Sequence, residues 1–167
     1  MFKPIHLLLI AAATTTSLMA GLFYAWSCSV TPGFQRLTDA SYIAVMQSCN
    51  RAIQNPVFFA GFFGALVLLP LCTFLQYSQP VTPRFWLLLA ASVCYVAGTF
   101  GVTVVGNVPM NELLDKFDLQ SATPEAIATM RAQFEGRWNS LNMIRTLSSI
   151  LAVMLVIAAC LSPQKPE

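Results

Sequence analysis

The sequence predicts an all-α fold, a four-transmembrane-helix bundle, and three observations support this prediction. Charged residues make up only 10% of the 167-residue chain, whereas a soluble domain carries about a quarter. Hydrophobic residues amount to 56%, and the mean hydropathy is +0.65. The charges leave four uncharged windows, at residues 4–35, 52–83, 85–111 and 146–164. Because about 20 mainly apolar residues cross a bilayer, each window can hold one helix.

We therefore expect a single integral membrane domain over residues 1–167. Its spans are predicted at about residues 5–28, 56–76, 85–106 and 139–161. A cleaved secretory signal peptide, with Ala20 near the cleavage site, is the alternative explanation of the first window. Apolar sequence continues beyond that site to Trp26, and this favours a retained span.

Two segments between the spans carry helix signals. A turn is predicted at Thr31-Pro32-Gly33, and apolar residues then recur at helical spacing between Tyr42 and Ile53. This pattern predicts a short amphipathic helix between spans 1 and 2, lying on the bundle or on the membrane interface. Between spans 3 and 4, Thr123-Pro124-Glu125 is a typical helix start. We expect that helical extramembrane segment to run into the fourth span without a loop.

The orientation follows from the basic residues near the first span. Four spans place both termini on one side, and Lys3 directly precedes the first span, whereas Arg36 lies well beyond it. The first helix usually dominates orientation, which predicts a multi-pass cell-membrane protein with cytoplasmic termini. Cys28 and Cys49 then fall on the oxidising outer side. They form either a disulfide or two small buried hydrophobic residues.

The residue inventory excludes several membrane functions. His6 is the sole histidine, so a haem held by two histidines is impossible. The chain has no C-x-x-C, no phosphate-binding glycine loop and no H-E-x-x-H. The first three windows contain no charged residue, which disfavours proton-coupled transport through a buried carboxylate. We expect no cofactor and no metal site.

A polar cluster remains where spans 3 and 4 meet one membrane surface. Asn107 and Asn111 are four residues apart, and Trp138, Asn142 and Arg145 are spaced at i, i+4 and i+7. Each set projects from one face if its segment is helical. Only 16 residues follow Arg145 up to Leu161, so the helix enters the membrane before Arg145. Its guanidinium must snorkel or find a partner below the surface.

Two interpretations of this cluster stay open. In the simpler one, Arg145 snorkels, the asparagines cap helix ends and Trp138 belongs to the aromatic belt. In the other, the five residues line a polar pocket that opens laterally to lipid and holds an amphipathic or quinone-like ligand. Pro109 supports the pocket, because it breaks helical bonding and leaves backbone carbonyls that need partners.

The same residues form two motifs, N-x-P-x-N at 107–111 and W-x-x-x-N-x-x-R at 138–145. With these motifs and the aromatic segment Phe23-Tyr24-Ala25-Trp26, the chain resembles the anthrone-oxygenase-like family of small four-helix membrane proteins. Most members are known only as a domain of unknown function. A few fungal members are associated with oxidising anthrones to anthraquinones without an obvious metal or flavin.

The resemblance implies a cofactor-free oxidoreductase acting on a lipophilic phenolic or polyketide-like substrate. Its pocket would be lined by Asn107, Asn111, Trp138, Asn142 and Arg145. Arg145 would stabilise a phenolate or enolate, the asparagines would donate to carbonyl oxygens, and Trp138 would stack on an aromatic ring. Glu112 is the one candidate base at the rim, and the catalytic residues stay unassigned.

The alternative is a non-catalytic membrane protein that binds a lipid, a quinone or a partner membrane protein. The expected partners are membrane lipids and a lipophilic aromatic small molecule, with a homo-oligomer left open. No nucleic acid is expected.

Overall fold

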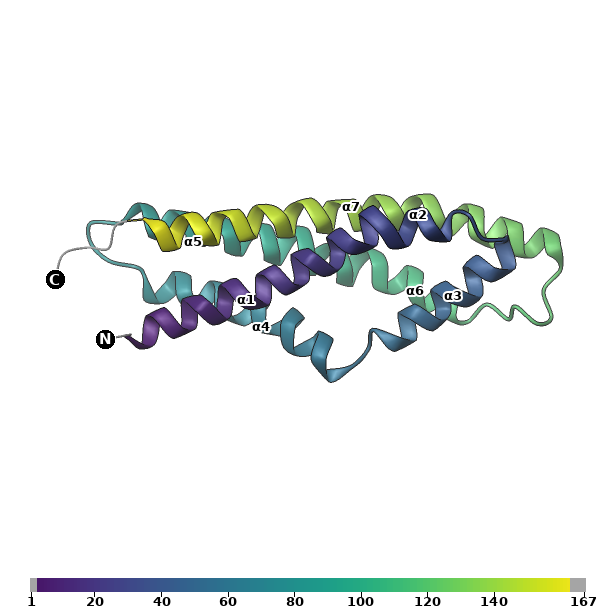
Figure 1. Cartoon of the computed structure of the whole chain (residues 1–167), viewed down its shortest axis with the longest axis horizontal. Coiled ribbons are helices and arrows are strands. Elements are labelled where there is room, and N and C mark those ends of the chain that lie inside the picture. The colour runs from purple at the N-terminus through teal and green to yellow at the C-terminus, as the bar shows by residue number, and fades with distance from the viewer. Residues whose placement is uncertain (1–2, 163–167) are drawn as a thin grey trace.

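The computed structural model describes residues 3–162, and every regular element among them is a helix. Four helical columns are long and apolar enough to cross a membrane: Pro4–Phe34, Pro56–Leu75, Pro83–Asp115 and Pro124–Leu161. They run along the long axis of the molecule, and the start of the first column lies at the same end as the finish of the fourth (Figure 1). The predicted four-helix membrane bundle is therefore confirmed.

The columns consist of several elements. The first comprises α1 (Pro4–Ala25), η1 (Trp26–Val30) and α2 (Thr31–Phe34), and the second is α4 (Pro56–Leu75). The third comprises α5 (Pro83–Val93), η2 (Cys94–Gly101), η3 (Thr103–Asn107) and α6 (Val108–Asp115), and the fourth is α7 (Pro124–Leu161). The elements labelled η are π-helical. The short helix α3 (Asp39–Ala52) connects the first two columns at the end where α6 lies (Figure 1).

Two helix starts carry a capping side chain, and the one at Thr123 was predicted. Asn55 Oδ1 accepts a hydrogen bond from the Phe58 backbone N–H at 3.0 Å, and Pro56 follows as the first helical residue. Thr123 Oγ1 accepts from the Ala126 N–H in the same way, and α7 then runs unbroken to Leu161. Each cap satisfies a backbone donor that the helix itself cannot.

Two predicted breaks are absent, and both involve a proline. Thr31-Pro32-Gly33 is helical in α2, and the turn comes later, at residues 35–37. The third column continues past Gly106 and Pro109 to Asp115. A π-helical segment directly precedes the proline-containing turn in both places. Because π-helical bonds reach one residue further back, the wider turn accommodates a proline ring that would crowd an α-helix.

The buried face of α3 also differs from the predicted one. Tyr42, Ile43, Met46 and Asn50 are buried, whereas Val45 is 36% exposed. The helix packs against α6 and α7 through this face. The buried face of α3 is therefore turned relative to the face that apolar spacing predicted. As a result a polar residue, Asn50, lies on the side that packs against the bundle.

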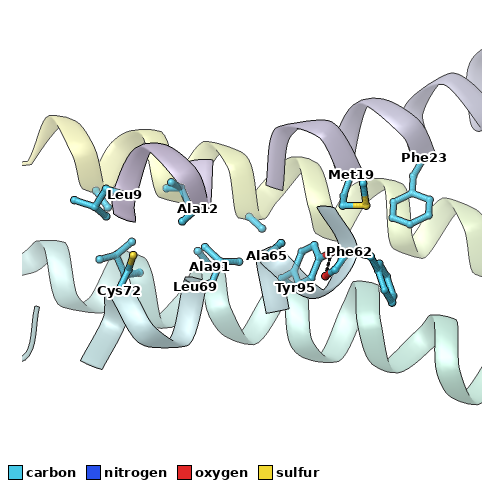
Figure 2. Packing of buried hydrophobic residues seen from close by; sticks show 14 residues of the cluster. Leu9, Ala12, Met19, Phe23, Phe62, Ala65, Leu69, Cys72, Ala91 and Tyr95 are labelled. Atoms are coloured by element: carbon cyan, nitrogen blue, oxygen red, sulfur yellow. Dashed lines mark hydrogen bonds between the residues drawn. The ribbon is translucent and has the colours of Figure 1, made fainter. Parts of the chain in front are cut away.

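The main core fills the seam between α1, α4, α5, η2 and α7 (Figure 2). Alanines at helix crossings are fully buried, among them Ala12, Ala65 and Ala91, and their small side chains allow close approach of the helices. Tyr95 is the large polar member, and its hydroxyl donates to the Phe62 carbonyl oxygen at 3.0 Å.

Gly98 lies at the tightest crossing, where η2 meets α7. A Cβ added there would overlap the side chain of Ser148. We expect Gly98→Ala to destabilise the bundle by about 1–3 kcal/mol, because overpacking displaces neighbouring backbone. Detergent or thermal unfolding of the purified protein measures this loss.

Two further variants make that prediction specific. Ser148→Gly should recover part of the loss when combined with Gly98→Ala, because it removes the overlapping atoms. Gly136→Ala is the matched control, since a Cβ at Gly136 meets nothing within 4 Å. Equal stability of Gly98→Ala and Gly136→Ala would contradict the proposed close contact.

Sequence reasoning missed the role of Arg84, which lies at the start of α5, just after the connection from α4. Its side chain is 4% exposed and reaches the C-terminus of α7. Nε donates to the Ala159 carbonyl at 2.9 Å, and Nη2 donates to the Ser162 carbonyl at 2.7 Å. The Ser162 N–H also bonds to the Ala159 carbonyl, so Arg84 adds to the capping of this helix end, and its charge complements the helix dipole.

Candidate functional site

Arg145 is the central residue of the candidate site. Its side chain is 6% exposed, Nη2 donates to Asn142 Oδ1 at 2.8 Å, and Nη1 lies 3.5 Å from Thr103 Oγ1. Nε is buried without a hydrogen-bond partner among residues 3–162. Within the same residues, no carboxylate lies at ion-pair distance from the guanidinium. The site therefore holds a buried cation whose charge is not balanced by an acidic side chain.

Two aromatic rings lie against this cation. The guanidinium carbon is 4.6 Å from the centroid of Phe23 and 5.3 Å from that of Trp138. Such cation–π contacts stabilise a guanidinium without neutralising it. They also hold the Arg145 side chain between α1 and α7.

A hydrogen-bond network fixes the orientation of Asn142. Its Nδ2 donates to Ser27 Oγ at 2.9 Å, while its Oδ1 accepts from Arg145. The Ser27 and Thr146 hydroxyls are hydrogen-bonded to each other at 2.8 Å, and Thr146 also donates to the Phe23 carbonyl. Both atoms of the Asn142 amide thus have partners on defined sides, so the amide cannot rotate without losing a bond.

A cavity of about 490 Å³ lies beside this polar group. This volume falls in the usual range of small-molecule sites. Arg145, Asn142 and Thr103 are polar residues of its wall, and most of the apolar residues that line it are aromatic. The aromatic lining consists of Phe23, Trp26, Phe58, Phe59, Phe62, Phe63, Phe100 and Trp138.

Polar side chains of α3, of α6 and of the residues just after these two helices form what we call the rim of the cavity. The rim consists of Asn50, Arg51, Gln54, Glu112, Asp115 and Lys116. Arg51 Nε and Asp115 Oδ1 form an ion pair at 2.6 Å, which connects α3 to α6 across the rim. The cavity thus combines an uncompensated cation, aromatic walls and a charged rim.

Four of the five predicted pocket residues line this cavity: Asn111, Trp138, Asn142 and Arg145. Trp138 Nε1 donates to Asn111 Oδ1 at 2.8 Å, which joins the two motifs directly. Asn107 is different, because it is fully buried outside the cavity wall. Asn107 is the last residue of η3, whereas Asn111 lies in α6, and only Asn111 reaches the cavity.

Sequence reasoning missed the phenylalanine wall and the hydroxyl network. Phe58, Phe59, Phe62 and Phe63 recur at i, i+1, i+4 and i+5, a spacing that could have indicated an aromatic face of α4. Ser27, Thr103 and Thr146 lie inside apolar windows, where a hydroxyl signals a local contact but not its partner.

Cys28 and Cys49 do not pair in the structure. Both are free thiols; Cys28 is exposed and Cys49 is half-buried. Because the first column stays helical through Phe34, Cys28 lies on an outer face of η1, while Cys49 lies on α3 beyond the turn. The structure therefore does not contain the bridge.

These features define a small multi-pass membrane protein with an aromatic cavity above a buried arginine. The family model of anthrone oxygenase matches residues 57–155, which is more than half of the chain, and the chain belongs to this family. The matched region contains both motifs and the phenylalanine wall of α4. No curated protein and no solved structure matches the chain.

Proposed function

We propose that the protein oxidises an anthrone-like ketone or a related lipophilic phenol, bound as its enolate or phenolate in the cavity. The observation that carries this proposal is Arg145, a buried cation that faces an aromatic cavity and has no acidic partner among residues 3–162. A buried charge is stable only when it is balanced or well solvated. An anionic oxygen of the ligand supplies that balance.

The proposed reaction is balanced with dioxygen as the only oxidant. An anthrone loses the proton of its acidic C–H bond and becomes an electron-rich enolate. That carbon then reacts with dioxygen; one oxygen atom becomes the new carbonyl, and the other leaves with two hydrogens as water. Arg145 favours the anion because a fixed cation in the cavity wall stabilises the oxygen where charge develops. The Asn142 side chain keeps the guanidinium in place.

The walls favour a flat, apolar ring system. Phe62 and Phe100 lie 5.4 Å apart between ring centroids, and Trp26 and Trp138 lie 5.3 Å apart. A polycyclic aromatic substrate can stack or make edge contacts with such rings. The exposed fractions of Phe63 and Val104 are both 47%, so the cavity wall reaches the surface that faces lipid, from which a lipophilic substrate enters.

We further propose cytoplasmic termini, which place the cavity toward the outer leaflet. Lys3 before the first column supports this orientation. A reporter fused to the C-terminus should give a cytoplasmic signal, and a signal from the opposite side would reverse the assignment.

Oxygen uptake by the purified protein in lipid nanodiscs tests the catalytic proposal. We expect one dioxygen consumed per quinone formed with an anthrone substrate, above the rate in empty nanodiscs. Ligand binding without oxygen uptake would contradict catalysis. In that case, loss of a co-purified lipid or quinone from the Asn142→Ala variant would support the non-catalytic binding function in place of the catalytic one.

A further inference from the structure

We propose that Glu112 is the catalytic base that removes the proton from the substrate. This inference rests on the proposed function. The reaction needs a proton acceptor, and the buried part of the cavity does not supply one. Arg145 and the asparagine side chains stabilise an anion, but none of them accepts a proton at neutral pH. The base must therefore be another group on the cavity wall.

Glu112 and Asp115 are the carboxylates that line the cavity. Asp115 Oδ1 forms an ion pair with Arg51 Nε at 2.6 Å. This contact stabilises the charged form of the Asp115 carboxylate and occupies one of its two oxygens. Glu112 forms no ion pair with any residue that the structure describes. Of the two, Glu112 has the carboxylate that is available to a ligand.

Glu112 and Arg145 line the same cavity from different places. Arg145 contacts Thr103, and Glu112 follows nine residues later in the same column, about 13 Å along the axis at 1.5 Å per residue. Glu112 is exposed at the rim, whereas Arg145 is buried at the inner wall, so a ligand in the cavity can lie between them. In an anthrone the acidic C–H lies across the central ring from the carbonyl. A base and an oxyanion donor at opposite ends of the cavity suit that arrangement.

The proposed step transfers one proton. The substrate C–H bond breaks, an O–H bond forms on the Glu112 carboxylate, and the electron pair moves to the carbonyl oxygen beside Arg145. Because Glu112 is exposed at the rim, it can release the proton to water before the next turnover. The other charged groups facing the cavity are Arg51, Asp115 and Lys116 at the rim and Arg145 at the inner wall.

Glu112→Gln tests this assignment, because glutamine keeps the shape and cannot accept the proton. General base catalysis is worth about 10²- to 10⁴-fold, so we expect turnover at neutral pH to fall by at least about 100-fold. The deficit should shrink as the pH approaches the ionisation of the substrate itself, since the solvent then forms the enolate. Glu112→Asp should recover part of the rate.

The control is Glu125→Gln, which removes the same charge from an exposed position outside the cavity wall and should leave turnover unchanged. If the wild-type protein turns over and Glu112→Gln retains its rate at neutral pH, Glu112 is not the base. A deficit that stays constant across the pH range would equally overturn the proposal. Lack of turnover in the wild type would instead contradict the proposed function.

Discussion

Arg145→Met is expected to lower turnover of an anthrone substrate by about 10²- to 10³-fold, the usual cost of losing one oxyanion donor. Arg145 is the cation at the inner wall of the cavity, and methionine fills its space without charge. The enolate then loses its main stabilising partner. Oxygen uptake and quinone absorbance measure the change.

The same variant should fold normally, which separates this role from a structural one. The wild-type guanidinium is buried without an acidic partner among residues 3–162, so its removal eliminates a desolvation cost. We expect an unfolding midpoint equal to or above that of the wild type. Arg145→Lys keeps the charge but loses the planar fork, and its turnover should be intermediate. Turnover of Arg145→Met within threefold of wild type would exclude the proposed role.

Arg131→Met is expected to release α3 from the rest of the protein. Arg131 Nη1 donates to Asp39 Oδ1 at 2.9 Å and to the Leu37 carbonyl at 2.8 Å, while Nε donates to Glu135 at 2.8 Å. The guanidinium also lies 4.6 Å from the ring centroid of Tyr42. Burial raises the pKa of the Tyr42 hydroxyl, so this ring remains a neutral phenol. One side chain thus joins α7 to both the 35–37 turn and α3.

Loss of these charge-assisted hydrogen bonds should cost about 3 kcal/mol of local stability. Because local opening controls amide exchange, protection within α3 should fall by roughly 100-fold in hydrogen–deuterium exchange. Turnover should fall as well, since α3 supplies Asn50 and Arg51 to the rim.

Arg137→Met is the matched control, because Arg137 is exposed on the same helix. It should leave α3 protected. Equal exchange in the two variants would show that Arg131 does not hold α3.

The grouping of the candidate residues around one cavity follows helical spacing on α7 but not at the end of the third column. Trp138, Asn142 and Arg145 lie in an unbroken α-helix, and all three line the cavity as their spacing indicates. Asn107 and Asn111 lie across a change from π to α geometry, and only Asn111 reaches the cavity. Helical spacing alone does not show which of the two asparagines reaches the cavity, because that depends on how the third column packs against its neighbours.

Composition and charge spacing alone established that this chain is a four-helix membrane protein with Arg145 too deep for an ordinary surface residue. Both are properties of short segments. The bilayer thickness sets the length of a span, and the cost of burying a charge makes a charge within a span unusual, so both can be inferred from the sequence. Which side chains share a cavity depends on helix rotation and on contacts between residues far apart in the chain. The phenylalanine wall on α4, the Ser27 hydroxyl behind Asn142 and the lack of an acidic partner for Arg145 among residues 3–162 therefore emerged only once the helices were packed together.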